Sequence, residues 1–291
     1  MIRLKLLIAA ALATMAATAQ AAQPIDWGLW FQNAASARMR DIAWFGEYTS
    51  WIVGAIAIFV TALLAWVMIR YNARVNKTPT KTSHNTVIEI LWTVVPVLIL
   101  IVIAIPSFRL LFNQLEIPEA EVTVKATGYQ WYWGYEYPDG GDIQFDSVML
   151  SDDERAQRQE QMGWTDKEVP RLLAVDNEMV VPVGKVVVLQ VTAEDVLHAF
   201  AMPALGLKLD AIPGRLNQTW FKAEKEGVYF GQCSELCGRG HAYMPIAIRV
   251  VSEDRYQQWL TAAADDLEAA NQMLAGWIAA DKTKFAQATG N

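Results

Sequence analysis

Two long stretches without a charged side chain, 48–69 and 90–108, dominate the hydrophobic pattern of the first part of the chain. A helix rises about 1.5 Å per residue, so a run of this length reaches about 30 Å, the thickness of the hydrocarbon core of a membrane. Such runs are too long and too apolar for ordinary core helices. The pattern therefore predicts transmembrane helices over 48–69 and 90–112, joined by a loop over 70–89.

The loop between the two predicted helices is basic. It contains Arg70, Arg74, Lys77 and Lys81, and no acid precedes Glu89 at its end. Short loops rich in Lys and Arg remain on the cytoplasmic side of a membrane. Both ends of the mature chain are therefore expected on the opposite side, in a bacterial periplasm.

The first 21 residues have the layout of a secretory signal peptide. Arg3 and Lys5 precede an apolar run, which small residues follow. We predict cleavage near Ala21 or Ala22, which leaves 22–47 as an N-terminal periplasmic segment. A short membrane anchor is the alternative interpretation, although the apolar run is short for one.

From about residue 117 the pattern changes to short alternating runs rich in Val, Tyr and Trp, separated by Gly, Pro and Asp. Such runs predict an antiparallel β-sandwich or barrel, here over 113–258. The strongly polar stretch 151–170 interrupts them and is interpreted as a surface insertion. Helical spacing and many alanines predict an amphipathic C-terminal helix within 259–291, docked on the domain or on a partner.

The charge distribution separates the two parts of the chain. Hydrophobic residues make up 53% of it and charged residues 19%, where a soluble domain has about 25% charged residues. Residues 1–112 carry 9 Lys and Arg against 4 Asp and Glu, a net charge of +5. Residues 113–291 carry 15 against 27, a net charge of −12, so the whole chain is at −7. The acidic part excludes a nucleic-acid-binding function, which needs a basic surface, and suits a basic protein partner.

Four potential metal ligands fall within twelve residues of the acidic part: Cys233, Cys237, His241 and Met244. The other histidine of this part is His198. Thiolate and thioether donors select soft metals, and imidazole suits copper as well as zinc. A blue-copper site uses a single Cys with two His and an axial Met. The second cysteine is superfluous for one copper ion, whereas a dinuclear copper centre uses both.

Three other interpretations of these residues stay open from the spacing alone. Cys233 and Cys237 could form a disulfide, since a secreted domain lies in an oxidising compartment. Two Cys and two His could bind zinc, although a structural zinc site has no use for Met244. The residues could also be unrelated packing residues. The crowding of soft donors favours a metal over a disulfide, and copper over zinc.

Four motifs in this order resemble one known family. EILWTVVPVLILIVIAIPS, GYQWYWGYEYP, EDVLHAF and CSELCGRGHAYMP are similar to segments of cytochrome c oxidase subunit II of the bacterial aa3 type, and the resemblance covers nearly all of 45–258. It implies a cupredoxin-like β-barrel or sandwich held above the membrane by a two-helix hairpin. It also implies a dinuclear copper centre, CuA, with two copper ions per chain.

The resemblance implies that copper is bound by His198, Cys233, Cys237, His241, Met244 and the backbone carbonyl of Glu235. In the family both cysteines bridge the two ions, each histidine binds one, and the methionine is a weak ligand. The Glu235 side chain is implied to bind a magnesium ion shared with subunit I, which suits a hard carboxylate ligand. A solvated loop acid is the alternative for Glu235.

The resemblance also implies where electrons enter. The family residue that matches Trp131 is exposed and accepts an electron from cytochrome c; packing in the β-core is the alternative. Nearby acids would attract a lysine-rich donor. The candidate docking acids are Glu136, Asp146, Asp176 and Asp195, with Glu194 and Asp139 as weaker candidates. Each acid alone is equally explained as ordinary soluble surface.

Glu89 begins the second predicted membrane helix. The resemblance implies that it lies at the mouth of the K proton pathway into subunit I. An acid at a helix N-terminus is also favourable for electrostatic reasons alone, so a capping role is the alternative.

The implied function is that of subunit II of a haem–copper oxidase. It accepts electrons from cytochrome c at CuA and passes them to haem in subunit I, which holds haem a, haem a3 and CuB and reduces oxygen to water with proton pumping. Subunit III and membrane lipid are further implied partners. The implied location is the bacterial inner membrane, with the copper domain and both mature termini in the periplasm.

Four other classes of protein share parts of this pattern. A quinol oxidase subunit II keeps the hairpin and a structural cupredoxin domain but lacks the copper ligands, and the complete donor set counts against it. Nitrous oxide reductase needs a second, histidine-rich copper site, which three histidines cannot build. A zinc-stabilised membrane module is disfavoured by Met244 and the Trp-rich strand. A fused cytochrome is excluded because the chain has no CxxCH motif.

Overall fold

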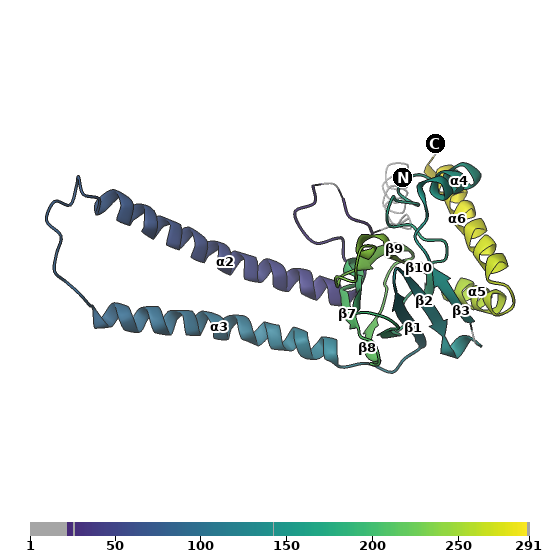
Figure 1. Cartoon of the computed structure of the whole chain (residues 1–291), viewed down its shortest axis with the longest axis horizontal. Coiled ribbons are helices and arrows are strands. Elements are labelled where there is room, and N and C mark those ends of the chain that lie inside the picture. The colour runs from purple at the N-terminus through teal and green to yellow at the C-terminus, as the bar shows by residue number, and fades with distance from the viewer. Residues whose placement is uncertain (1–21, 26, 142, 290–291) are drawn as a thin grey trace, which may run out of the picture. The chain divides into compact units, whose positions relative to one another are not determined.

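The structure is a computed structural model that describes residues 22–25, 27–141 and 143–289. Two long helices make up most of one of its two units, residues 40–116 (Figure 1). They are α2 (Ala37–Arg70) and α3 (Thr86–Leu115). Both are long and apolar enough to cross a membrane, and most of their large hydrophobic side chains are exposed. The predicted signal peptide lies outside the described residues.

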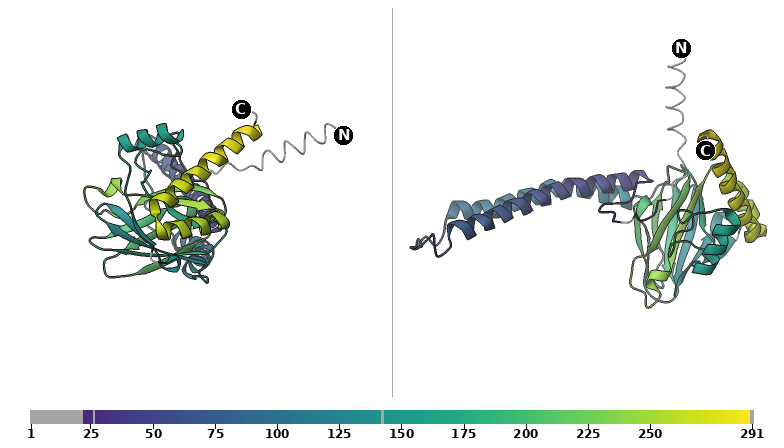
Figure 2. Two further views of the ribbon diagram at one scale, coloured as in Figure 1. Left: turned by 90° about the vertical axis from the view of Figure 1, so that its right-hand side faces the viewer. Right: turned by 90° about the horizontal axis from the view of Figure 1, so that it is seen from above.

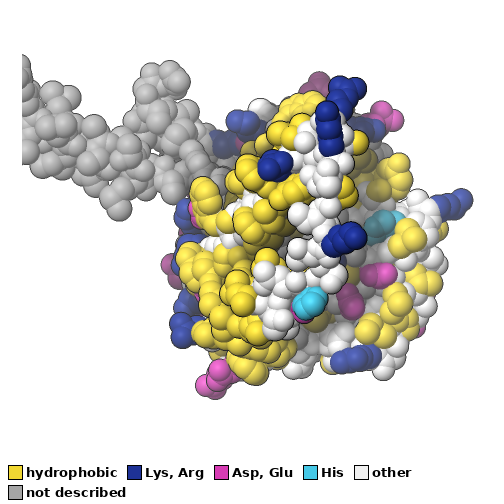
Figure 3. Space-filling view, turned by 90° about the vertical axis from the view of Figure 1, so that its left-hand side faces the viewer, with side chains coloured by type: hydrophobic (Ala, Val, Ile, Leu, Met, Phe, Trp, Pro, Cys, Tyr) yellow, Lys and Arg dark blue, Asp and Glu magenta, His cyan; other side chains and the backbone are white. Residues whose placement is uncertain are grey.

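The loop between α2 and α3 carries the basic side chains that set the predicted orientation. Residues 77–85 of this loop are all exposed. Figure 3 shows one face of the molecule, on which Lys and Arg side chains lie beside broad hydrophobic areas. Exposed basic residues that follow an apolar helix are typical of a membrane helix end that meets water.

Two side chains cap the N-terminus of α3. Asn85 Oδ1 accepts hydrogen bonds from the backbone N–H groups of Val87 (3.1 Å) and Ile88 (3.3 Å). Glu89 Oε1 accepts one from the backbone N–H of Asn85, at 3.2 Å. The first N–H groups of a helix have no partner within the helix, so these bonds satisfy part of that demand. Glu89 therefore has a local structural role.

Two five-stranded sheets form the second unit, which comprises residues 22–39 and 117–289 of the described chain (Figure 1 and Figure 2). The sheet orders are β3-β2-β1-β5-β8 and β4-β10-β9-β6-β7. The strands are β1 (Val122–Tyr129), β2 (Tyr132–Tyr137), β3 (Ile143–Ser147), β4 (Met179–Pro182), β5 (Val187–Ala193), β6 (His198–Met202), β7 (Leu207–Ala211), β8 (Asn217–Phe221), β9 (Gly227–Cys233) and β10 (Pro245–Val251).

Each sheet contains one parallel pair, whereas the sequence pattern predicted antiparallel pairing throughout. β1 runs parallel to β5, with Val122 opposite Val187 and Gly128 opposite Ala193. β4 runs parallel to β10. The chain reaches these partners through long connections that contain other strands, and such connections allow parallel neighbours where a hairpin does not. The predicted sandwich itself is confirmed.

Aromatic side chains of β2 fill the space between the two sheets. Trp133, Tyr135 and Tyr137 alternate along the strand and are buried. The Tyr137 hydroxyl donates to the carbonyl of Val180 on β4 at 3.0 Å and accepts from its N–H at 2.8 Å. This pair of bonds joins the first sheet to the second through the core.

The polar insertion and the C-terminal region share a small core. Helix α4 (Asp152–Met162) is capped by Ser151, the residue before it, whose side chain forms a reciprocal cap with Glu154. A separate hydrophobic cluster includes residues on both sides of this helix: Leu150, Trp164, Val169 and Ala174, packed against Met162, Ala275 and Ile278. An ion pair of 2.9 Å joins Glu168 to Lys282. The insertion is therefore packed against the C-terminal helix along part of its length.

The C-terminal region consists of two helices where the sequence predicted one. They are α5 (Glu253–Asp265) and α6 (Leu267–Thr289). Between them, Asp266 Oδ1 accepts hydrogen bonds from the N–H groups of Glu268 (2.9 Å) and Ala269 (3.2 Å), so it starts a new helix. Tyr256 and Trp259 of α5 are buried in the main core. The C-terminal region thus docks on the domain.

The N-terminal segment is attached to the same domain. Ala22 forms a β-bridge beside β9: its N–H donates to Val228 O at 3.0 Å and its carbonyl accepts from the N–H of Phe230 at 3.1 Å. Further along, the N–H of Ala35 donates to Ala204 O at 2.8 Å. The chain is therefore held to the sandwich at both ends of this segment.

A largely buried ion pair involves strand β10 of the sheet β4-β10-β9-β6-β7. The Arg249 guanidinium on β10 donates to both carboxylate oxygens of Glu178, at 2.6 and 2.8 Å. Their side chains are only 8% and 14% exposed. Removing one partner of such a pair leaves a buried charge unpaired, which is more costly than the pair itself is stabilising.

We expect Arg249→Met to destabilise the domain by about 3–5 kcal/mol and the double variant Arg249→Met/Glu178→Leu to recover most of that loss. Denaturant unfolding followed by near-ultraviolet circular dichroism measures both. Lys125→Met is the matched control, because the Lys125–Glu136 pair is about one-third exposed and is worth about 1 kcal/mol or less. Equal losses for Arg249→Met and Lys125→Met would contradict the prediction.

Candidate metal centre

The predicted metal ligands come from two neighbouring strands and one loop. His198 opens β6 and Cys233 closes β9, and these strands pair with each other. Cys237, His241 and Met244 follow on the loop that leads to β10. The sheet therefore brings a histidine and a cysteine that are far apart in sequence to the same end of the sandwich.

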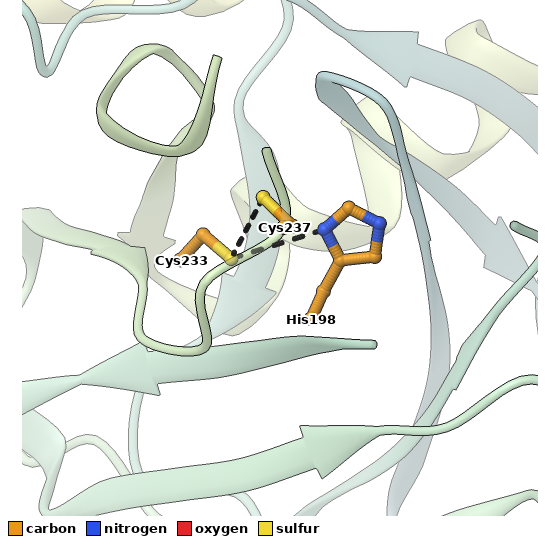
Figure 4. Close-up of side chains that lie close together, drawn as sticks. All are labelled: His198, Cys233 and Cys237. Atoms are coloured by element: carbon orange, nitrogen blue, oxygen red, sulfur yellow. Dashed lines mark hydrogen bonds between the residues drawn. The ribbon is translucent and has the colours of Figure 1, made fainter. Parts of the chain in front are cut away.

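Three of these side chains converge on one point (Figure 4). Cys233 Sγ is 3.8 Å from His198 Nδ1 and 3.9 Å from Cys237 Sγ. All three are buried, and their ligand atoms lie within 4.8 Å of one another. Both thiols are free, and the space between them is well beyond the 2.05 Å or so of a disulfide bond.

The loop supplies three more donors around the same sulfurs. Cys237 Sγ lies 3.6 Å from His241 Nδ1 and 3.5 Å from Met244 Sδ. The carbonyl oxygen of Glu235 lies 3.4 Å from Cys233 Sγ, while the Glu235 side chain is exposed. Every residue predicted to bind copper therefore faces one of the two cysteine sulfurs.

The two facing thiols influence each other's ionisation. Burial opposes ionisation of Cys233, but the facing His198 and other hydrogen bonds outweigh it and lower the pKa of this thiol. Burial and the negative charge of an ionised Cys233 raise the pKa of Cys237. One thiolate forms readily here, and a second needs a positive charge close by, which a bound metal supplies.

Asp195 contacts His198 at Nε2, the ring nitrogen that does not face the sulfurs. Asp195 Oδ1 lies 2.9 Å from His198 Nε2, and Asp195 Oδ2 accepts a hydrogen bond from the N–H of Gln130 at 2.7 Å. The bond at Nε2 leaves Nδ1 facing the sulfurs. β1 passes so close that a Cβ at Gly128 would lie 2.9 Å from the imidazole ring. A carboxylate and a close backbone thus fix the ring orientation, as is common for metal-binding histidines.

Two tryptophans donate to carbonyl oxygens of the same loop. Trp131 Nε1 donates to Cys237 O at 3.1 Å, and Trp133 Nε1 donates to Met244 O at 3.4 Å. Gln130 Nε2 also donates to Cys237 O, at 2.9 Å. Trp133 is fully buried, whereas Trp131 lies in the turn between β1 and β2 and is partly exposed. Of the two tryptophans, Trp131 is therefore the one that is accessible from solvent while bonded to the loop.

The donor set fits a soft metal. Two thiols, two imidazoles, a thioether and a carbonyl oxygen gather around the two cysteine sulfurs, and this combination suits copper. Glu235 itself is exposed. The crowding of soft donors inferred from the sequence is thus present in three dimensions.

Four of the six candidate docking acids lie near the aromatic turn, which we define as residues 129–132. Tyr129 and Tyr132 stack there with their ring centroids 4.8 Å apart. Burial and nearby negative charges raise the pKa of both tyrosines. The acids responsible are Glu136, Asp146, Glu194 and Asp195.

The other two candidate acids serve the backbone elsewhere. Asp176 accepts hydrogen bonds from the N–H groups of Val148 and Asn177, both at 2.7 Å, and burial raises its pKa. Asp139 accepts from the N–H of Thr123, at the end of β1 opposite the aromatic turn. Both carboxylates therefore have structural partners that explain them without a docking role.

Comparisons with known proteins agree with this site. Residues 122–251 match the family described as cytochrome c oxidase subunit II, periplasmic domain, and residues 24–110 match its transmembrane domain. A probable cytochrome c oxidase subunit 2 of Rickettsia bellii is 50% identical over 240 residues, 82% of this chain and 86% of the relative. This chain belongs to the cytochrome c oxidase subunit II family.

The chain is also similar to a further subunit 2 sequence and to one solved structure. Cytochrome c oxidase subunit 2 of Cereibacter sphaeroides is 49% identical over 268 residues, 86% of this chain and 88% of the relative. The crystal structure of the periplasmic domain of subunit II of cytochrome oxidase of Bradyrhizobium japonicum is 55% identical, with a TM-score of 0.45, covering 52% of this chain and 99% of that one.

Membership in the subunit II family confirms the resemblance drawn from the four motifs. The chain is a membrane protein with a cupredoxin-like periplasmic domain, and it is a subunit of an oxidoreductase complex, cytochrome c oxidase. Its two cysteines and His198 form the candidate copper site of that domain.

Sequence reasoning missed two contacts of this site and assigned one residue differently. Asp195 was considered only as a docking acid, yet its carboxylate touches His198. Gln130 and Arg239 were not singled out, although Gln130 binds the carbonyl of Cys237 and Arg239 lies over Trp131. The spacing of Asp195 three residues before His198 was the available signal; the other two depend on tertiary contacts.

We expect Asp195→Asn to weaken copper binding by about 10–100-fold, the usual effect of removing a carboxylate that orients a metal-binding histidine. Competition with a copper chelator measures the affinity. Glu194→Gln is the control, since it removes the neighbouring charge without touching His198. Unchanged affinity in Asp195→Asn, or an equal loss in both variants, would assign Asp195 to the protein surface alone.

Proposed function

We propose that this chain is the subunit through which electrons from cytochrome c enter the oxidase, with a dinuclear copper centre in its periplasmic domain. One observation carries the proposal: two buried cysteine sulfurs 3.9 Å apart, with a separate imidazole facing each of them. A doubled, nearly symmetric set of soft donors suits two copper ions better than one. When bound, copper supplies a one-electron carrier between cytochrome c and the haem of subunit I.

The ligands divide between the two proposed ions. Cys233 and Cys237 would bridge both, and His198 and His241 would each bind one. Met244 faces Cys237, and the carbonyl of Glu235 faces Cys233, which supports one weak ligand for each ion. The hydrogen bonds to His198 and to the loop carbonyls hold these donors still, which favours fast electron transfer because little has to move.

A magnesium ion shared with subunit I is the second proposed cofactor. The exposure of Glu235 supports it, because a hard carboxylate ligand suits magnesium and not the soft copper site. The relatives are named cytochrome c oxidase subunit 2, which favours a cytochrome c donor over a quinol. Subunit I, with haem a, haem a3 and CuB, and subunit III complete the proposed assembly.

We place the chain in the bacterial inner membrane, with both mature termini in the periplasm. The basic loop between α2 and α3 supports this orientation, since such loops stay in the cytoplasm. Attachment of Ala22, Ala35 and the C-terminal helices to the periplasmic domain is in accord with it.

Electron spin resonance of the purified oxidase tests the copper proposal. We expect a signal in which one unpaired electron is shared over two copper nuclei, and we expect Cys237→Ser to abolish this pattern, since one bridging sulfur is lost. A single-nucleus pattern in the unaltered domain would indicate a blue-copper-like carrier. Zinc in place of copper would leave only a structural role for the site.

We expect Trp131→Phe to slow electron transfer from cytochrome c on the order of tenfold or more, as when an interaction specific to the reacting complex is removed. The indole hydrogen bond to Cys237 O is lost, while the ligands stay in place. Stopped-flow oxidation of reduced cytochrome c measures the rate, and an unaltered copper signal is the control. Normal turnover would return Trp131 to a packing role.

Two roles of Glu89, as a helix cap and in proton transfer, can be distinguished by substitution. Glu89→Gln keeps an oxygen that can accept the N–H of Asn85 but removes the ionisable group. We propose that Glu89 lies at the mouth of a proton pathway and expect Glu89→Gln to lower proton-coupled turnover with unchanged copper spectra. Wild-type turnover in Glu89→Gln, combined with a stability loss in Glu89→Ala, would leave the cap alone.

A further inference from the structure

A positive charge lies directly on the indole at which electrons are proposed to enter. The guanidinium carbon of Arg239 is 5.5 Å from the centroid of the Trp131 ring, within range of a cation–π contact. Arg239 is exposed and belongs to the loop between Cys237 and His241. Its contact with Trp131 is therefore made on the surface, immediately outside the candidate copper site.

The loop backbone and the indole are packed against each other. A Cβ at Gly240 would overlap the Trp131 ring, and one at Gly238 would lie 3.0 Å from it. Gly238 also has φ +118°, a conformation that side chains other than glycine rarely adopt. With the bond from Trp131 Nε1 to Cys237 O, these contacts fix the indole to the loop, so Arg239 sits at a defined place beside it.

The aromatic turn, which Arg239 contacts through Trp131, has several carboxylates close to its two tyrosines. The carboxylates that act on the stacked pair Tyr129 and Tyr132 are Glu136, Asp146, Glu194 and Asp195. Glu136 is partly neutralised by Lys125, at 2.8 Å. The aromatic turn therefore combines carboxylates around the tyrosines with the guanidinium of Arg239 at Trp131.

We propose that Arg239 is a specificity-determining residue that controls how a basic cytochrome c docks over Trp131. The acids attract the lysines of the donor, and Arg239 repels any lysine that approaches the indole itself. The donor is left to place an uncharged surface, or an oxygen that accepts from the guanidinium, over Trp131. The inference rests on the proposed donor, and it gives Arg239 two opposite effects: slower association and better alignment.

Binding and transfer are measured separately in the intact oxidase. Association of oxidised, basic cytochrome c is followed by surface plasmon resonance at several salt concentrations, and the first-order transfer step by stopped flow at saturating reduced cytochrome c. In Arg239→Gln we expect association at low salt to rise about two- to fivefold with a steeper salt dependence, as for removal of a repulsive rim charge. We expect the first-order step to fall about threefold or more, since a misplaced donor transfers more slowly.

Two variants control for charge and for packing. Arg239→Lys keeps the charge and should retain the unaltered association rate. Lys167→Gln removes one exposed positive charge from the insertion, outside the aromatic turn, and should change neither step. The electron spin resonance spectrum should stay the same in all three variants.

Several results would overturn the inference. Unchanged association in Arg239→Gln would remove the charge effect, and a rise equal to that in Lys167→Gln would make it a general effect of net charge. Slower association together with an altered copper spectrum would show that Arg239 only supports the loop. Failure of the proposed function would give a different result from failure of this inference: the unaltered oxidase would then neither bind cytochrome c nor show the shared copper signal.

Discussion

The site depends on hydrogen bonds that hold the β9–β10 loop by its own carbonyl oxygens. Trp131 and Trp133 are on β2 and its preceding turn, in one sheet, and they donate to Cys237 O and Met244 O on the connection between two strands of the other sheet. These bonds satisfy polar backbone atoms that the folded loop would otherwise bury without partners. They also join the two sheets at the end where the soft donors gather. The loop can therefore keep two thiols close together before any metal balances their charge.

The same arrangement connects the donors to the surface. The carbonyl of Cys237 accepts from the indole of Trp131, and Cys237 Sγ is one of the two facing sulfurs. A short covalent and hydrogen-bonded path thus runs from a partly exposed ring to a buried ligand. On the other side, Asp195 joins His198 to the backbone of Gln130 in the same turn. The aromatic turn is in this sense part of the metal centre's support as well as its outer face.

Much of this could be predicted from the sequence because it depends on residue type and short spacing. Cys233, Cys237, His241 and Met244 are close in sequence, and the two apolar helices are continuous runs. His198 could be added through the family resemblance. The parallel pairing of β1 with β5 and the packing of the insertion on α6 depend on contacts between distant segments, which alternating patterns do not encode. The contact of Asp195 with His198 was missed for the same reason: the fold, not the sequence pattern, places this carboxylate against a buried imidazole. The break at Asp266 is local, since its side chain accepts from the N–H groups of Glu268 and Ala269 within a stretch of uniformly helical spacing.

The acidic charges of the domain act on a partner in different ways, depending on how far each lies from Trp131. The −12 of residues 113–291 acts at long range on any basic partner, and it does so as a sum. Close to Trp131 only a few groups matter, because screening in salt removes charges beyond about 10 Å. Asp176 and Asp139 bind backbone N–H groups, and Asp195 supports His198, so three of the six acids are explained by the fold itself. Long-range attraction and local alignment are therefore set by different residues, and a change in docking rate need not follow the net charge of the domain.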